Sequence, residues 1–240
     1  MICKGCNQDR KLIKSHIIPE SFFIGHRVEN KSPLLMSDSI NSYPKKSLIG
    51  VYDEGILCKE CEDKFQEVDN YGYTLFLKNE SSHIELKKSG SVFGYQVNDV
   101  NYRLLKLFFI SVLWRASIST QGFYSKIQLG RYESIAKNII WSGCLDGTSV
   151  FNFIVAKLDT EIGRVMLSPE RTRFFGVNYY LFYMYGYVVY IKVDKRPTPE
   201  KFRLFELNSD GTLYICHRDI SKSTELEIML SIMSNNRKYF

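Results

Sequence analysis

The chain has 240 residues, of which 45% are hydrophobic and 24% are charged, with 32 Lys and Arg against 26 Asp and Glu. This composition excludes a wholly disordered chain, and the length suffices to bury a core without a disulfide framework. No stretch approaches the roughly 18 uncharged apolar residues of a membrane span, and the first residues lack a signal peptide's apolar run, so we expect a cytoplasmic protein with no membrane partner.

The net charge of +6 is unevenly distributed along the chain. Residues 1–78 hold 11 basic and 11 acidic side chains, whereas residues 79–240 hold 21 basic and 15 acidic ones. A basic excess attracts nucleic acid, because Lys and Arg displace counterions from phosphates. The cations are spread out with no run of Lys or Arg, so charge alone favours an ordinary, mildly basic surface.

Hydrophobic periodicity predicts an α+β protein with two domains, residues 1–78 and 79–240. In the first, an extended stretch precedes a helix start after Pro19. Residues 29–44 are rich in Ser, Asn and Pro and predict a loop. An extended segment at 50–57 then leads into a helix over 62–77.

The second domain begins with a polar connection that contains a short strand at 92–97. Apolar periodicity predicts further helices over 101–118, 129–141 and 223–233. Runs rich in β-branched and aromatic residues predict antiparallel strands over 150–156, 177–184, 187–193, 202–207 and 212–217. Residues 208–211, Asn-Ser-Asp-Gly, predict a hairpin turn between the last two strands.

Two Cys-x-x-Cys pairs are the strongest local signal. Four thiolates suit a tetrahedral zinc ion, and the two-residue spacing lets both sulfurs of one turn face it. The first pair lies in a loop and the second at a helix start, which is the layout of a treble-clef zinc module. The alternative is two unrelated pairs in a reducing compartment. The predicted ligands are Cys3, Cys6, Cys58 and Cys61, while Cys144 and Cys216 are expected to be small buried hydrophobic residues.

Between the pairs stands Ser15-His-Ile-Ile-Pro19, and the second pair begins as Leu57-Cys58. With the first pair, these motifs resemble those of the HNH, or ββα-metal, nucleases. The resemblance implies that His16 is the general base that activates water, and that a divalent ion, Mg²⁺ or Mn²⁺, stabilises the scissile phosphate.

The sequence departs from the HNH pattern at two metal-ligand positions, which hold Ser15 and Glu62. On a helix, Glu62 and Asp69 lie near one face and provide carboxylates for an ion, so both are candidate catalytic residues. HNH nucleases also have a central Asn in their motif, and the only candidate for it in this interval of the sequence is Asn41, which matches weakly. Alternatively, Glu62 and Asp69 lie on a solvated face and His16 binds a backbone carbonyl.

The chain also resembles a group of uncharacterised bacterial proteins in which the same head precedes a Trp-Arg-Ala-Ser helix, here 114–117. That resemblance implies a prokaryotic or mobile-element source, where HNH-like proteins often serve antiviral defence. Arg115 stands on the apolar helix. A buried Arg needs an anion, so it binds a carboxylate such as Asp69 or a phosphate, unless its head reaches solvent.

Seven aromatic residues crowd the segment 179–190. With Arg164, Arg171 and Arg173 they suit a stacking surface for single strands, but alternating aromatics also pack half-buried strands, and that interpretation is favoured.

Two functional hypotheses remain. The first is an HNH-like metal-dependent nuclease acting on DNA or RNA phosphodiesters, with structural zinc and catalytic Mg²⁺ or Mn²⁺. The alternative is a non-catalytic zinc-stabilised binding or adaptor module that recognises nucleic acid or a partner protein in a defence complex.

Overall fold

The computed structural model confirms the α+β class. It describes residues 1–23, 33–37, 44–145, 149–158, 165–207, 210–219, 221 and 223–235. Asn41 and Arg164 lie outside these residues. Among the described residues, no helix combines the length and apolar character needed to cross a membrane.

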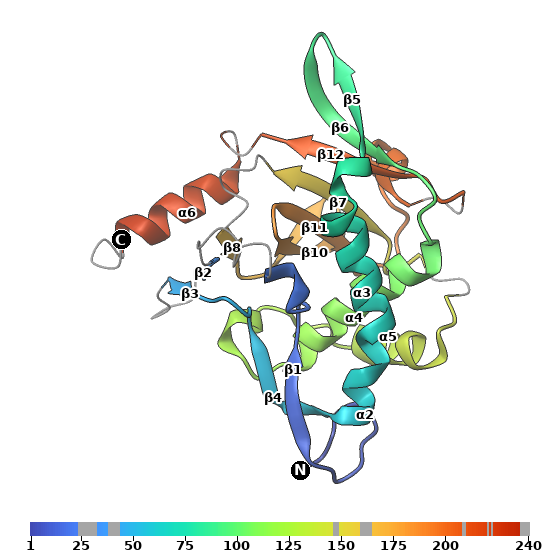
Figure 1. Ribbon diagram of the computed structural model, residues 1–240, viewed down its shortest axis with the longest axis vertical. Helices are drawn as coiled ribbons and strands as arrows, with labels where there is room; N and C mark the ends of the chain where they lie inside the picture. The colour runs from blue at the N-terminus through green and yellow to red at the C-terminus, as the bar shows by residue number, and fades with distance from the viewer. Residues whose placement is uncertain are drawn as a thin grey trace.

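The N-terminal part is an antiparallel pair of strands followed by a helical stretch (Figure 1). The strands are β1 (Leu12–His16) and β4 (Tyr52–Cys58). The helical stretch then runs without a break through α2 (Lys59–Glu62), η1 (Asp63–Phe65), α3 (Gln66–Tyr73) and the π-helical turn η2 (Thr74–Lys78). The predicted helix over 62–77 is therefore confirmed, although it begins three residues earlier.

The helix α4 (Tyr102–Ile118) forms the centre of the molecule, and nearly all its side chains are buried. Asn101 caps it, since its Oδ1 accepts a hydrogen bond of 3.0 Å from the Leu104 N–H. The neighbouring α5 (Tyr132–Ser142) ends at Gly143, whose φ of +66° suits a left-handed cap. Two short 3₁₀ turns stand before and after α4 in the chain: η3 (Glu80–Ser82) precedes it, and η4 (Gly122–Tyr124) connects it to α5.

A seven-stranded sheet forms most of the C-terminal part, in the order β5-β6-β12-β7-β11-β10-β9. All its neighbours are antiparallel except β12 and β7. The β5/β6 hairpin projects from the body (Figure 1). The bounds are β5 (Ile84–Lys88), β6 (Ser91–Val97), β7 (Phe153–Leu158), β9 (Glu170–Phe174), β10 (Val177–Met184), β11 (Tyr187–Lys192) and β12 (Leu213–Arg218).

The central strands of this sheet are buried on both faces, as the aromatic strand β10 illustrates. Tyr180 and Phe182 belong to the main core with α4, whereas Tyr179 and Tyr183 pack in a second cluster with Met229 of α6 (Thr224–Asn235). Alternate side chains of β10 therefore fill opposite cores. The packing interpretation of these aromatics is confirmed.

A small three-stranded sheet joins distant parts of the chain. Its order is β3-β2-β8, with β2 parallel to β8. The strands are β2 (Leu34–Met36), β3 (Lys45–Lys46) and β8 (Val165–Leu167). β2 interrupts the predicted loop over 29–44. The main hydrophobic core likewise contains side chains from both sides of the 78/79 boundary. The division into two domains stays a prediction.

The predicted strand over 202–207 is wrong. The segment forms the 3₁₀ helix η5 (Glu200–Phe205), because Pro199 supplies a helix start and Phe202 and Phe205 recur at the three-residue period of such a helix. β12 consequently pairs with β6 and β7 instead of forming the predicted hairpin. Residues 208–209 of the predicted turn lie outside the described residues.

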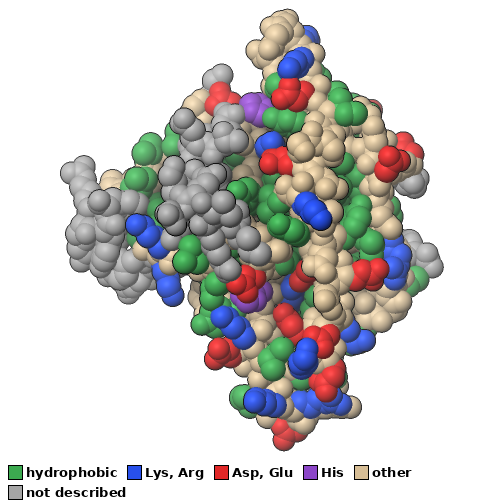
Figure 2. All heavy atoms as spheres, viewed as in Figure 1, with side chains coloured by type: hydrophobic (Ala, Val, Ile, Leu, Met, Phe, Trp, Pro, Cys, Tyr) green, Lys and Arg blue, Asp and Glu red, His purple; other side chains and the backbone are tan. Residues whose placement is uncertain are grey.

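Acidic and basic side chains are interspersed over the face shown in Figure 2, including the end that carries β1, β4 and α2. This mixture agrees with the equal charge counts of residues 1–78. No cationic surface therefore appears on this face among the described side chains of the N-terminal part.

Candidate functional site

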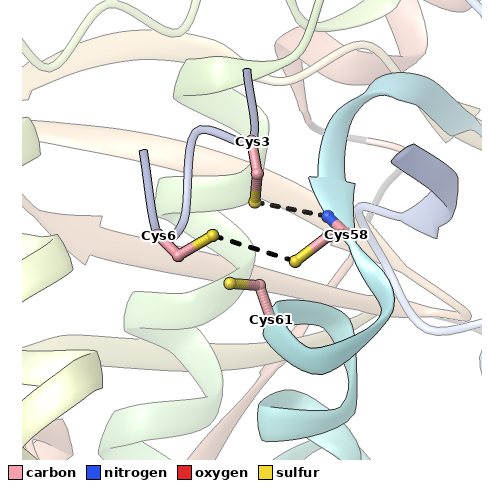
Figure 3. Close-up of side chains that lie close together, drawn as sticks. All are labelled: Cys3, Cys6, Cys58 and Cys61. Atoms are coloured by element: carbon pink, nitrogen blue, oxygen red, sulfur yellow. Dashed lines mark hydrogen bonds between the residues drawn. The ribbon is translucent and has the colours of Figure 1, made fainter. Parts of the chain in front are cut away.

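The structure brings the four predicted zinc ligands together (Figure 3). Cys3 and Cys6 lie in the turn before β1, Cys58 ends β4, and Cys61 lies in α2. Their sulfur atoms all lie within 4.8 Å of one another, and Cys6 Sγ and Cys58 Sγ are 3.9 Å apart. Tetrahedral zinc with bonds near 2.3 Å requires sulfurs about 3.8 Å apart, so this group has the spacing to hold a metal ion such as zinc.

The turn that carries the first pair depends on a glycine. A Cβ atom on Gly5 would lie 2.7 Å from Cys61 Sγ, closer than real Cβ contacts allow. Asn7 closes the turn in the left-handed region, with φ of +58°, and its N–H donates to the Cys3 carbonyl at 2.8 Å. The two thiol pairs can therefore approach because no side chain separates them.

Hydrogen bonds from two lysines connect this turn to α4 and α5. Lys4 Nζ donates to the Ile118 carbonyl at the end of α4, at 2.6 Å, and Lys137 Nζ of α5 donates to the Lys4 carbonyl at 2.7 Å. Beneath the turn, Trp114 and Trp141 meet edge to face with ring centroids 5.1 Å apart. The four-cysteine group is thus built into the core.

Backbone donors also shape the ionisation of these thiols. Burial opposes ionisation of Cys3, but backbone N–H groups, including that of Cys58 at 3.3 Å from Cys3 Sγ, lower its pKa to about 6. Burial raises the pKa of Cys58 and Cys61. A cation at the centre would favour the thiolate form of all four, because metal binding displaces thiol protons.

His16 is the last residue of β1, opposite Tyr52 in the register of the pair. Its side chain is half-buried at 17% exposure, and its ring meets that of Tyr52 edge to face at 5.9 Å. Nε2 lies 3.9 Å from Glu20 Oε2, which is an ion pair only when the imidazole is protonated. The backbone carbonyl of His16 accepts a hydrogen bond of 2.9 Å from Arg115 Nη1.

Glu62 lies beside the end of β1. Burial raises its pKa, while the charge of Arg115 and the nearby Ser15 hydroxyl oppose that rise. Glu62 Oε2 and Ser15 Oγ are both buried without a hydrogen bond of standard geometry to any described residue. An orphaned carboxylate oxygen is the kind of atom that a cation satisfies.

Asp69 is engaged elsewhere. Arg115 Nη2 donates to Asp69 Oδ1 at 2.6 Å and Nη1 donates to Oδ2 at 2.8 Å, so the guanidinium holds both oxygens. Arg115 itself is fully buried and also donates to Ser111 Oγ at 3.2 Å. Its expected carboxylate partner is therefore confirmed, and Asp69 lies in an ion pair rather than on a solvated face.

Asp53, a buried carboxylate with several hydrogen-bond donors around it, is not among the residues predicted from the sequence. Asp53 is 1% exposed, and its Oδ2 accepts from Ser119 Oγ at 3.0 Å and from the N–H and Oγ1 of Thr120 at 2.5 and 2.9 Å. These donors lower its pKa despite burial. The signal available in the sequence is a charged residue inside the strand that precedes Leu57-Cys58.

The remaining cysteines differ from one another. Cys144 is exposed, contrary to expectation, whereas Cys216 in β12 is half-buried. Neither belongs to the four-cysteine group.

No family model, curated protein or solved structure matches the chain.

Proposed function

We propose that the N-terminal part is a treble-clef zinc module and that it carries an HNH-like, metal-dependent nuclease site for DNA or RNA phosphodiesters. The observation that carries the proposal is the meeting of three elements. β1 ends at His16, β4 leads into α2, and α2 ends at Glu62, whose Oε2 is buried without a hydrogen bond of standard geometry to a described residue. Two antiparallel strands and a helix around a base and an acid are what the HNH resemblance predicts.

The roles follow from the chemistry of each residue. Zinc held by the four cysteines would stabilise the module, and His16 would accept the proton of the attacking water, since neutral imidazole is a base near pH 7. Glu62 would hold a divalent ion, Mg²⁺ or Mn²⁺, which supplies Lewis-acid stabilisation of charge on the scissile phosphate. Asp69 would not be a ligand, because Arg115 occupies both its oxygens.

The test is nicking of supercoiled plasmid with Mg²⁺ or Mn²⁺. Glu62→Gln should lower the cleavage rate at least about 100-fold, because the ion that Glu62 would hold supplies several kcal/mol of charge stabilisation on the phosphate. Glu67→Gln is the matched control, because Glu67 is exposed on the helix that follows. Equal cleavage by both variants would overturn the role of Glu62, and absence of metal-dependent nicking by the wild type would overturn the nuclease proposal.

The second candidate is a non-catalytic zinc module that binds nucleic acid or a partner protein. The Arg115–Asp69 ion pair favours it, because that pair removes one of the two predicted carboxylate ligands from ion binding. A wild type that binds oligonucleotide or captures a partner and never nicks plasmid would support this candidate. In either case the resemblance to bacterial proteins points to a defence context, for which phage plating on cells with and without the protein is the test.

A further inference from the structure

A hollow of about 430 Å³ lies between the start of α5, the strands β9 and β10, and the segment that follows β11. Its charged lining consists of four cations and one carboxylate. The cations are exposed: Arg131, Arg171, Lys195 and Arg196. These side chains come from three places in the chain, since Lys195 and Arg196 are adjacent, so the concentration of charge arises only on folding.

The single carboxylate of the hollow is already neutralised. Asp194 accepts hydrogen bonds from Arg196 Nε at 2.9 Å and from Asn178 Nδ2 and N–H at 2.9 and 3.1 Å. The Arg196 guanidinium holds the pKa of Asp194 well below its usual range. The positive charge of Arg196 is therefore neutralised by Asp194. The other three cations give the hollow its net positive charge.

The remaining cations have only neutral partners among the described residues. Arg171 Nη2 donates to Asn178 Oδ1 at 3.0 Å, and Arg131 Nη2 donates to Tyr132 OH at 3.2 Å. Lys195 makes no ion pair with any described carboxylate. A concave surface that gathers uncompensated cations concentrates the positive potential and attracts anions.

The cationic surface continues beyond the hollow. A Cβ atom on Gly176 would lie 3.6 Å from Arg196 Nη1 and 4.0 Å from Arg173 Nη2, so these two guanidinium groups flank the β9/β10 turn. Arg173 Nε donates to the Gly176 carbonyl at 3.0 Å. β9 is an edge strand, which leaves Arg171 and Arg173 accessible along one side of the sheet. Four cations without an ion-pair partner among the described residues, Arg131, Arg171, Lys195 and Arg173, exceed what one small anion needs.

We infer that this cationic hollow, with Arg173 as its extension, binds the phosphate backbone of a nucleic acid strand. Guanidinium groups match phosphate oxygens in pairs, and lysine supplies a point charge. The start of α5 lines the hollow at Tyr132 and adds its positive end to the same field. The inference deepens the proposed function by naming the surface for its substrate, and rests on that function only for the choice of nucleic acid over other polyanions.

The experiment is fluorescence anisotropy with a labelled oligonucleotide of about 20 residues, long enough to cover such a surface. It uses the whole 240-residue chain with His16→Ala and no added divalent ion, so that cleavage cannot interfere. The test variant combines Arg131→Gln, Arg171→Gln and Lys195→Gln. The control combines Lys11→Gln, Lys78→Gln and Lys88→Gln, which removes the same charge from exposed positions elsewhere.

We expect the test variant to bind about 30-fold more weakly and to lower the slope of log Kd against log salt by about two, since single strands release about 0.7 counterions per contact. The control should stay within about threefold of its parent. Lys195→Gln alone, which disturbs no hydrogen bond with a described residue, should weaken binding by about threefold if the test variant fails to fold.

Equal losses in the test and control variants would overturn the inference. A second contradicting result would be displacement of the labelled oligonucleotide by poly-glutamate or pyrophosphate as effectively as by unlabelled oligonucleotide, compared at equal concentrations of anionic groups. The site would then accept any anion. Binding without nicking by the wild type would contradict the nuclease proposal and leave this inference intact. Nicking by the wild type, together with equal losses of binding in the test and control variants, would support the nuclease proposal and contradict this inference.

Discussion

Arg115, fully buried in the last turn of α4, donates hydrogen bonds to both carboxylate oxygens of Asp69, at 2.6 and 2.8 Å. The same guanidinium donates to the His16 carbonyl and lies 4.6 Å from the centre of the Phe65 ring. One side chain therefore connects α4, α3 and the end of β1. The position of His16 depends on this connection as well as on the strand pair.

Asp69→Asn should destabilise the protein by about 3–5 kcal/mol, because it leaves the Arg115 charge buried without its partner. The measurement is urea unfolding followed by circular dichroism. Lys59→Met is the control, since Lys59 pairs with Asp63 at an exposed site and should cost less than about 1 kcal/mol. A cost for Asp69→Asn no larger than that of Lys59→Met would show that the pair does not secure the site.

Cys58→Ser should abolish tight zinc binding and unfold the N-terminal part, because four thiolates share one ion. Zinc per chain, measured by atomic absorption on purified protein, should fall from about one to near zero. Cys144→Ser, at the exposed cysteine, should change neither zinc content nor melting temperature. Full zinc content in Cys58→Ser would contradict the four-thiolate site.

Gly5→Ala tests the close approach of the two thiol pairs. The new methyl group would meet Cys61 Sγ at 2.7 Å, so we expect a loss of about 1–3 kcal/mol and weaker zinc retention against a chelator. Gly122→Ala is the matched control, because a Cβ there meets nothing within 4 Å. Identical zinc release by the two variants would refute the packing argument.

Lys106 should make stability rise with pH in the alkaline range. Burial lowers its pKa from 10.5 to about 8, so the unfolded state binds more protons between these values and the free energy of unfolding increases as pH rises through them. Relative to Lys106→Met, the wild type should gain stability from pH 8 to pH 10, as measured by denaturant unfolding. Lys88→Met, at an exposed position, should show no such trend relative to the wild type. A constant difference between wild type and Lys106→Met would contradict the depressed pKa.

Local pattern predicted the elements that are marked by a helical period or by a run of β-branched and aromatic residues within one segment. The helix expected over 101–118 corresponds to α4, and the strand over 177–184 has the bounds of β10. The cysteine spacing predicted the thiol cluster, since each pair belongs to one turn. A charge on an apolar helix limited Arg115 to a few roles, of which the pairing with Asp69 is the one observed.

Elements that depend on distant partners could not be predicted in this way. β2 has three residues and pairs with β8, which is about 130 positions later, so no local periodicity marks it. The segment 202–207 has strand composition, but Pro199 and the phenylalanine spacing favour η5. The cationic hollow likewise joins residues from four segments, whose proximity only folding creates.

The proposed role of His16 as the general base is tested most directly by the rate of plasmid nicking by zinc-loaded His16→Ala, measured with and without added imidazole. We predict a rate 100- to 10,000-fold below the wild type, which is roughly the contribution of general-base catalysis, with partial recovery in imidazole. His217→Ala, the matched histidine variant in β12, should nick at the wild-type rate. Nicking by His16→Ala at the wild-type rate would contradict the claim.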